Sequence, residues 1–295
     1  MLPELPLAPL QPLHLPWLER AAVQVAVLRL DLIDPLISGN KWFKLKHHLL
    51  AARAQGMHGL ISLGGAHSNH LHALAAAGKR LGLHTVGLLR GHPQATPTVA
   101  DLQAFGMQLH WLGYGGYRAR HVPGFWDSWQ QLYPGFLPIA QGGAGAEGVK
   151  GCAEIVAQLR QQLPSIGWAD YDGWWLAAGT GTTAAGLALA EVGAHPVYAA
   201  LAVPAGHGVA EQLQALGAPE VLQVAASRGG FAKVDDELLA FMSETEAACG
   251  LPLEPLYTAK ALLALREGLE SGQVRPGQRL VFVHTGGLQG RRGFA

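Results

Sequence analysis

Cysteine and charge are both scarce in this sequence of 295 residues. The only two cysteines are Cys152 and Cys249, which are too few to build a disulfide framework and are typical of a protein kept in a reducing compartment. Charged residues make up 14% of the chain, and 21 basic side chains balance 21 acidic ones. Nucleic-acid binding needs clustered Lys and Arg, so we expect no nucleic-acid partner.

Long apolar runs are absent as well. The first 20 residues are rich in Leu and Pro but contain no basic segment and no unbroken apolar stretch. Because a signal peptide or a membrane span would look different, we expect a soluble, cytoplasmic protein without a membrane partner, whose N-terminus is an extended arm packed on the body. Hydrophobic residues make up 49% of the chain, which indicates a well-buried globular interior.

Short apolar runs alternate with segments of helical periodicity along most of the chain. We expect strands within residues 21–32, 58–65, 83–90, 107–113, 171–179, 196–204, 219–227 and 279–287. We expect helices over residues 41–55, 68–82, 97–105 and 146–163. The glycine-rich, aromatic segment 113–127 is expected to form a loop over a cleft.

This order of strands and helices predicts an α/β fold built from two open domains with parallel sheets. Residues 54–140 are expected to form a small α/β domain. Residues 1–53 and 141–295 are expected to form the large domain, which would bind a cofactor.

Lys41 follows a Gly-Asn pair at the predicted start of a helix. A lysine that forms a Schiff base must approach its cofactor closely and be partly desolvated, because its free pKa is about 10.4. The neighbouring Gly39 permits such a close approach of the backbone. Taken alone, the same pattern is more often a solvated lysine on the first turn of a helix.

A second candidate is the turn at which a predicted strand ends in Gly64-Gly65 and Ser68-Asn69 opens a helix. Such a turn directs backbone N–H groups at an anion, here a substrate carboxylate. The alternative is a plain N-cap, for which Ser and Asn are preferred. The nearby histidines at 67, 70 and 72 cannot all face one way on a helix and have no Cys or carboxylate beside them, so we expect no metal site.

A third candidate is the turn Gly179-Thr180-Gly181-Thr182-Thr183, placed between an apolar strand and a helix of small residues. Glycines expose N–H groups, hydroxyls add donors, and the helix dipole points inward, as a phosphate site requires. The turn lacks the lysine of a nucleotide P-loop and the acidic residue of a dinucleotide fold, which favours a monophosphate. The alternative is a tight turn without a ligand.

Two further segments are unremarkable when taken alone. Tyr257 and Thr258 stand at the start of a predicted helix, where Thr258 is a natural N-cap. The strand 279–284 ends in another Thr-Gly-Gly turn.

The motifs are specific for a protein family when they are taken together. They occur along the chain in the order GNK, a second lysine, GG-x-x-SN, GTGTT, PxYxxK and a terminal HTGG. From about residue 28 onward, the chain resembles the family of 1-aminocyclopropane-1-carboxylate deaminase and D-cysteine desulfhydrase. That family has the tryptophan-synthase-β-like fold of the fold type II pyridoxal-phosphate enzymes. The resemblance implies pyridoxal 5'-phosphate as the cofactor, a small amino acid as the substrate and a homodimer.

The resemblance also implies roles for individual residues. Lys41 matches the lysine that holds the cofactor and moves the substrate's α-proton, and Lys44 matches a second lysine near the phosphate. Ser68 matches a serine near the substrate carboxylate, and Asn69 matches the residue that contacts the cofactor's phenolic oxygen. Tyr257 matches an active-site tyrosine. The residues that match the phosphate site are Gly179, Thr180, Gly181, Thr182 and Thr183.

Thr258 bears on the choice of reaction. In the resembled family the deaminases have Glu after the tyrosine, facing the pyridine nitrogen, and the desulfhydrases have Thr. A hydroxyl leaves that nitrogen largely neutral, which suits β-elimination better than the opening of a cyclopropane. The sequence therefore predicts a desulfhydrase-like lyase that converts a small amino acid such as D-cysteine to pyruvate, ammonia and sulfide.

Two departures from the family pattern keep other functions open. Phe231 stands where a second tyrosine is common, and Ala144-Gly145 replaces the Ser-Asn of a familiar GGSN segment. The alternatives are a 1-aminocyclopropane-1-carboxylate deaminase, a lyase or racemase for another small amino acid, and a non-catalytic protein that only binds the cofactor.

Overall fold

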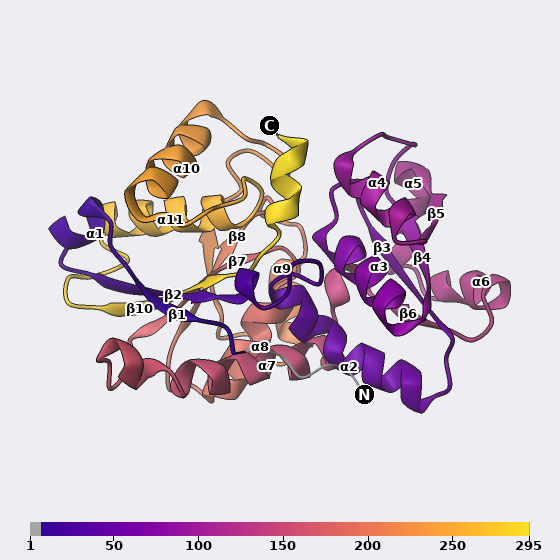
Figure 1. The fold of residues 1–295 in the computed structure, drawn as a ribbon, viewed down its shortest axis with the longest axis horizontal. Helices are drawn as coiled ribbons and strands as arrows, with labels where there is room; N and C mark the ends of the chain where they lie inside the picture. Colours follow the sequence, from indigo (N-terminus) through magenta and orange to yellow (C-terminus); the bar gives the residue numbers. More distant parts are fainter. Residues whose placement is uncertain (1–6, 295) are drawn as a thin grey trace.

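The computed structural model describes residues 7–294, which form two sheets covered by helices (Figure 1), both parallel except for one edge strand of the larger sheet. One sheet has six strands in the order β1-β2-β10-β7-β8-β9, and the other has four in the order β5-β4-β3-β6. The predicted α/β fold with two parallel sheets is confirmed. The strands of the larger sheet are β1 (Leu10–Leu13), β2 (Gln24–Arg29), β7 (Gly173–Ala178), β8 (Val197–Leu201), β9 (Leu222–Ala225) and β10 (Arg279–His284).

The central strands of the larger sheet are fully buried runs of apolar residues. All six residues of β7, GWWLAA, are buried, and β10 is buried after its first residue. Such runs are typical of parallel strands covered on both faces. Figure 1 shows α10 (Asp236–Cys249) and α11 (Thr258–Glu270) on one face of this sheet, and α7 (Ala146–Arg160) and α8 (Thr182–Glu191) on the other.

The smaller sheet consists of β3 (Gly59–Gly64), β4 (His84–Leu89), β5 (Gln108–Trp111) and β6 (Phe136–Ile139), all parallel. Its strands fall between residues 54 and 140, although the domain boundaries themselves stay a prediction. The helices that accompany it are α3 (Asn69–Leu81), α4 (Pro97–Ala104), α5 (Gly113–Arg118) and α6 (Phe125–Leu132). The long helix α2 (Asn40–Ala54) runs from the larger sheet to the smaller one (Figure 1).

The N-terminal arm is more ordered than an extended segment. Residues 1–6 of the predicted arm lie outside the described residues. The rest forms β1, which pairs antiparallel with β2, followed by the short helix α1 (Pro16–Arg20). The strand expected over residues 21–32 is limited to β2, because Leu30–Leu32 turns into a 3-10 helix.

The segment 113–127 is not the loop that its glycines suggested. Residues 113–118 form α5, Ala119–His121 form a 3-10 turn, and α6 begins at Phe125. The aromatic side chains explain the difference, because Tyr117 is buried in the core of the smaller sheet and Trp129 packs against it. Apolar burial of these rings outweighs the conformational cost of the glycines.

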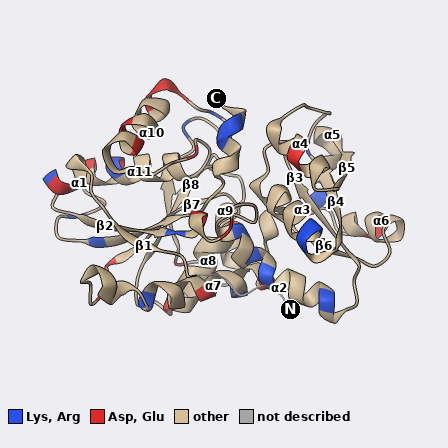
Figure 2. Ribbon diagram, viewed as in Figure 1, with Lys and Arg blue, Asp and Glu red and all other residues tan. Residues whose placement is uncertain are grey.

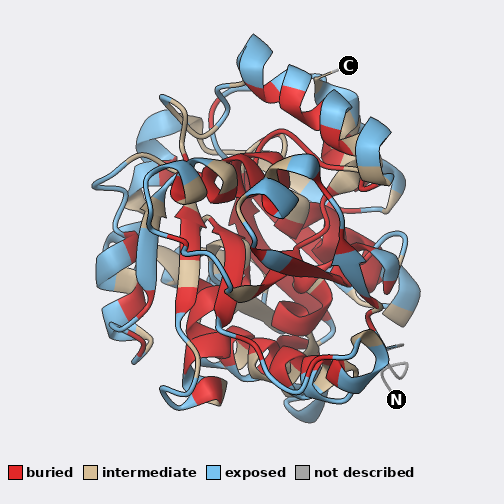
Figure 3. Cartoon of the chain, turned by 90° about the vertical axis from the view of Figure 1, so that its left-hand side faces the viewer, coloured by how far each residue is buried: buried red, intermediate tan, exposed pale blue. Residues whose placement is uncertain are grey.

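Burial and charge divide between the inside and the outside of the molecule. Figure 3 shows the buried residues concentrated in the strands and on the inner sides of the helices. Figure 2 shows charged residues of both signs scattered over both halves.

Within residues 7–294, no helix combines the length and the apolar character needed to span a bilayer. No cluster of three or more metal-ligating side chains occurs in the same described part of the chain.

Candidate active site

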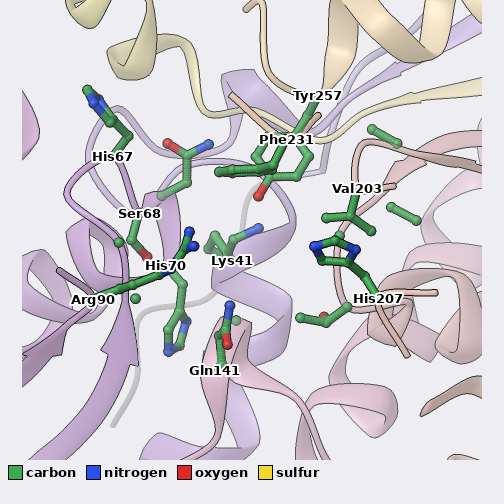
Figure 4. A pocket seen from close by; sticks show the side chains of 18 of the residues that line it. Lys41, His67, Ser68, His70, Arg90, Gln141, Val203, His207, Phe231 and Tyr257 are labelled. Atoms are coloured by element: carbon green, nitrogen blue, oxygen red, sulfur yellow. The ribbon is translucent and has the colours of Figure 1, made fainter. Parts of the chain in front are cut away.

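A cavity of about 530 Å³ lies where residues at the carboxyl ends of both sheets meet. This volume is typical of small-molecule sites, and the carboxyl ends of parallel strands are where α/β folds bind ligands. The turns after β3, β7 and β10 all contribute to its wall, which is why three separated sequence motifs meet here. Figure 4 shows Lys41 in the middle of the cavity, with Ser68 and Arg90 on one side and Val203 and His207 on the other.

Lys41 stands on the first turn of α2 and is held by its neighbour. Its Nζ donates a hydrogen bond to Oδ1 of Asn40 at 2.7 Å. Nδ2 of Asn40 in turn donates to Oγ1 of Thr183 at 2.8 Å. Asn40 is buried, so this chain ties the lysine to the turn after β7. A solvated helix-surface lysine would have no such connection.

The charge state of Lys41 is unusual for a lysine. Burial, with a smaller contribution from the Lys44 cation, lowers the pKa of Lys41 to about 7. Burial also lowers the pKa of Lys44, which lines the cavity one helical turn further on. A lysine with a pKa near neutrality is a substantial fraction free amine, the form that attacks an aldehyde.

Gly39 has a positional reason to be glycine. Its φ of 65° lies in the left-handed region, and a Cβ at this position would lie 2.0 Å from the carbonyl oxygen of Thr285. The backbone N–H of Asn40 donates to that same carbonyl at 3.2 Å. The start of α2 is therefore pressed against the turn after β10, which places Lys41 at the carboxyl end of the larger sheet.

The Gly64–Asn69 turn contains the expected N-cap and also lines the cavity. Ser68 caps α3, because its Oγ accepts a hydrogen bond from the N–H of Leu71 at 3.2 Å. Ser68 also lines the cavity and keeps its own O–H free to donate. Asn69 lines the cavity too, and its Oδ1 accepts from Nε2 of Gln289 at 2.9 Å. That bond leaves the amide N–H groups of Asn69 as donors, which suits contact with an anionic oxygen.

His70 was not predicted as a site residue, yet it lines the cavity with a defined tautomer. The hydroxyl of Ser62 donates to the carbonyl of Ile139 at 2.7 Å, so its oxygen accepts from Nε2–H of His70 at 2.8 Å. Nδ1 of His70 is then a bare acceptor that has no hydrogen-bond partner within the described chain. Burial and the nearby lysine cations keep the pKa of His70 well below its usual range.

The Gly179–Thr183 turn has the geometry of an anion cup. Gly181 has a φ of 74° directly before α8, a conformation that favours glycine. Oγ1 of Thr180 lies 3.0 Å from Oγ1 of Thr182. The residues of this turn that line the cavity are Gly179, Thr180, Gly181 and Thr183, whereas Thr182 is fully buried and is not part of the lining.

Tyr257 lines the cavity and is positioned by a buried carboxylate that the sequence did not point to. Oε1 of Glu254 accepts from the backbone N–H of Tyr257 at 2.6 Å and of Thr258 at 2.7 Å. Glu254 is 1% exposed, and burial raises its pKa to about 7 despite these bonds. The Tyr257 ring lies against Gly179, where a Cβ would approach it to 3.2 Å.

Thr258 is buried at the start of α11. Its side chain is fully buried, and Oγ1 accepts from the N–H of Glu254 at 2.9 Å. It is not among the residues that line the cavity, and its expected contact with the pyridine nitrogen stays a prediction. The reason for the burial is local, because the first turn of α11 closes a cap with the Glu254 segment. The threonine that lines the cavity is Thr285, in the Thr-Gly-Gly turn after β10.

Phe231 reaches the cavity from a loop that a buried lysine holds. Its ring packs edge-on against Tyr257, with centroids 5.5 Å apart. Nζ of Lys260 donates to the carbonyls of Ser227, Gly230 and Phe231 at 2.9, 2.8 and 3.1 Å. Lys260 is the lysine of the PxYxxK motif. It therefore supports the loop that carries Phe231, the residue that departs from the family pattern.

The residues present fit pyridoxal phosphate. The free amine of Lys41 can hold an aldehyde, the cup before α8 can hold a phosphate, and the amide of Asn69 faces the cavity between them. Gly142, with a φ of 72°, brings a second glycine turn against Thr180, where a Cβ would lie 2.9 Å from its methyl carbon. The cavity is thus shaped by glycine on both sides of the cup.

Comparison with known proteins agrees with this geometry. The family model described as "Pyridoxal-phosphate dependent enzyme" matches residues 6–286. A Pyrococcus horikoshii protein named "Putative 1-aminocyclopropane-1-carboxylate deaminase" is 28% identical over 307 residues, covering 94% of this chain and 89% of that protein. A Pyrococcus abyssi protein of the same name is 27% identical, with 94% and 88% covered.

Solved structures are similar in fold. The crystal structure of an ACC deaminase homologue matches with a TM-score of 0.83 and 25% identity, covering 97% of this chain and 91% of that one. A pyridoxal 5'-phosphate-dependent aspartate racemase matches with a TM-score of 0.70 and 17% identity, covering 96% and 91%. The second likeness concerns the fold alone. The chain belongs to the family of pyridoxal-phosphate dependent enzymes, with their type II fold and with pyridoxal 5'-phosphate as its cofactor.

Proposed function

We propose that this enzyme catalyses β-elimination on a small amino acid such as D-cysteine, yielding pyruvate, ammonia and sulfide. The observation that supports this reaction most is the absence of a carboxylate from the cavity wall. Among residues 7–294, the lining includes Lys, Arg, His, Ser, Thr and Tyr side chains but no Asp or Glu. A ring nitrogen without a carboxylate partner stays largely neutral, which suits loss of a good leaving group better than opening of a cyclopropane.

The chain supplies the proton transfers. When bound, pyridoxal phosphate withdraws electrons from the substrate's α-carbon. The amine of Lys41 accepts the α-proton, because its lowered pKa of about 7 leaves a substantial fraction of it unprotonated at neutral pH. Burial, reinforced by the Glu254 carboxylate, raises the pKa of Tyr257, so its hydroxyl keeps a proton that it can donate to the departing sulfur.

The substrate is oriented by the turn after β3. The N-terminus of α3 and the hydroxyl of Ser68 provide donors for the α-carboxylate. Asn69 and the Gly179–Thr183 cup would hold the cofactor's phenolic oxygen and phosphate. Lys44 would add a cation near the phosphate. Overall, D-cysteine and water give pyruvate, ammonia and hydrogen sulfide: the Cα–H and Cβ–S bonds break in the elimination, and the Cα–N bond breaks when water supplies the keto oxygen.

A 1-aminocyclopropane-1-carboxylate deaminase is the second candidate function. It is favoured by the names of the two Pyrococcus relatives. The buried position of Thr258 weakens the sequence argument against it, because that residue does not line the cavity. From the family resemblance we also propose a homodimer, which the molar mass of the holoenzyme in solution would test. The scarcity of cysteine supports a cytoplasmic location.

The proposal is tested by supplying purified holoenzyme with D-cysteine, L-cysteine, β-chloro-D-alanine and 1-aminocyclopropane-1-carboxylate. Pyruvate with sulfide from D-cysteine is the expected result, and Lys41→Ala should abolish it. 2-Oxobutanoate from the cyclopropane substrate alone would favour the deaminase. If no keto acid forms from any of the four compounds, the proposal that the enzyme catalyses β-elimination on small amino acids of this kind is wrong.

A further inference from the structure

Three arginines face the cavity from the side of the smaller sheet, and neither the cofactor nor the α-carboxylate accounts for them. Arg90 directly follows β4, Arg118 ends α5, and Arg120 lies in the next 3-10 turn. Within residues 7–294, none of the three forms an ion pair with a carboxylate. The phosphate cup belongs to the larger sheet, at the start of α8, so these cations lie on a different wall.

Two of these arginines, Arg90 and Arg120, lie near a polar group that has no partner in the described part of the chain. Tyr117 lines the cavity and is 3% exposed, yet its hydroxyl makes no hydrogen bond within the described chain. Nε of Arg120 is likewise buried without a partner there. The Arg120 guanidinium lies over the Tyr117 ring at 4.6 Å, and its Nη1 donates to the Tyr117 carbonyl at 2.9 Å. A buried donor without an acceptor is costly unless a ligand supplies the acceptor.

The Arg90 guanidinium is also available to bind a ligand. Its guanidinium lies over the ring of Tyr114 at 5.3 Å, and it makes no hydrogen bond with the described residues. Figure 4 shows its side chain extending into the cavity beside Ser68, toward Lys41. Planar guanidinium groups suit the paired oxygens of carboxylates, sulfonates and phosphates.

We propose that Arg90, Arg120 and Tyr117 form a second anion subsite, which takes the acidic side-chain group of an amino-acid substrate. The inference rests on the proposed elimination at this same cavity and deepens it. The turn after β3 takes the α-carboxylate, so the arginines are left for a second anion on the β-carbon. The preferred substrates are then amino acids that carry a β-sulfonate, a β-phosphate or a β-carboxylate.

The sulfonate and phosphate members of this class are also eliminable. With cysteate, water is consumed, the Cβ–S bond breaks with its electron pair on sulfur, and pyruvate, ammonia and sulfite form. With O-phosphoserine, the Cβ–O bond breaks and phosphate replaces sulfite. Aspartate has no such leaving group, so it serves as a probe of binding alone.

The test titrates the holoenzyme with D- and L-aspartate and, as matched neutral controls, with D- and L-asparagine. Binding is followed by the change in the visible absorbance of the bound cofactor, which needs no turnover. We expect one isomer of aspartate to bind at least about tenfold tighter than the corresponding asparagine. Equal binding of the two, or tighter binding of asparagine, would overturn the subsite.

Variants then assign the preference to residues. Arg90→Met and Arg120→Met should each lower the ratio of aspartate to asparagine affinity about 10- to 100-fold. The surface variant Arg275→Met, which removes an exposed arginine outside the cavity, is the matched control and should leave the ratio unchanged. Equal weakening of both ligands would mean that the arginines bind the α-carboxylate, and the proposal would be wrong.

Product assays separate this inference from the proposed function. Cysteate and O-phosphoserine are assayed for pyruvate, with sulfite and phosphate distinguishing the two anions, beside D-cysteine. If aspartate is preferred but no compound yields a keto acid, the subsite stands and the elimination fails. If D-cysteine yields pyruvate while aspartate binds no better than asparagine, the elimination stands and the subsite is overturned.

Discussion

The side-chain oxygen of Asn40 accepts a hydrogen bond from Nζ of Lys41, at 2.7 Å, while the amide nitrogen of the same Asn40 donates to Thr183. One buried amide therefore joins the lysine that would hold the aldehyde to the turn that would hold the phosphate. A single residue of α2 would therefore help to place both ends of the cofactor.

Asn40→Asp should raise the pKa of Lys41 above about 7, because a carboxylate at this distance stabilises the ammonium form. Pyridoxal phosphate attaches to the free amine, so the pH midpoint of its attachment to the apoenzyme should move upward. The appearance of visible absorbance, followed as a function of pH, measures that midpoint. Asn40→Ala adds no charge and should slow attachment without the same upward shift. A midpoint that stays or falls in the Asp variant would contradict the role of this contact.

Lys44→Met should also raise the pKa of Lys41, since the Lys44 cation is the second cause of its lowering after burial. The shift should be smaller than that of Asn40→Asp, because Met only removes a like charge whereas Asp adds a carboxylate in contact with Nζ of Lys41. Lys44→Arg keeps the cation and should leave the midpoint near 7. The same attachment assay distinguishes the two variants, and equal midpoints for Met and Arg would show that Lys44 does not act on Lys41.

The local motifs of the site could be predicted because each one is a short contiguous pattern, and the turns that begin at Gly64 and Gly179 come directly at the ends of buried strands. Lys41, the Gly64–Asn69 turn and the Gly179–Thr183 turn are contiguous patterns, and the parallel sheets bring strand ends together at one edge. The fold was predictable for the same reason, since its strands are short apolar runs separated by helical periods.

Contacts between distant segments could not be predicted in this way. Gln289 holds Asn69 across 220 positions of sequence, and no spacing announces such a pair. Arg90 is followed by a single glycine and has no Ser, Thr or Asn within the next four residues, so little in the local sequence marks it as part of a site. The burial of Thr258 depends on how the Glu254 segment closes onto α11, and a family pattern aligned by position carries no such detail.

Thr258→Val should destabilise the protein by about 1–3 kcal/mol, because the buried N–H of Glu254 loses its acceptor. Urea unfolding of the holoenzyme measures this free energy. The absorbance spectrum of the bound cofactor should stay as in the parent protein, since Thr258 does not line the cavity. Thr258→Ser keeps the hydroxyl and should recover most of the stability. A changed spectrum with unchanged stability would restore the family role, a contact with the ring nitrogen.

Lys260→Met should loosen the loop that carries Phe231. The lysine is 1% exposed and donates to three loop carbonyls, which its loss would leave without that donor. Charge-assisted hydrogen bonds of this kind contribute about 1.5–3 kcal/mol each, although water reaches the vacated loop carbonyls and reduces the net cost.

Because Phe231 packs on Tyr257, the loosened loop should raise KM for the amino-acid substrate more than it lowers kcat. Steady-state kinetics together with protease sensitivity near residues 227–231 measure the effect.

Burial lowers the pKa of Lys260 to about 8, so the parent enzyme itself should lose the ammonium as the pH rises through 8. The hydrogen bonds that hold the loop should weaken with it. KM should therefore climb above this pH in the parent and stay flat in Lys260→Met. A parallel rise in both proteins would show that the lysine does not hold the loop, whatever the variant does to stability.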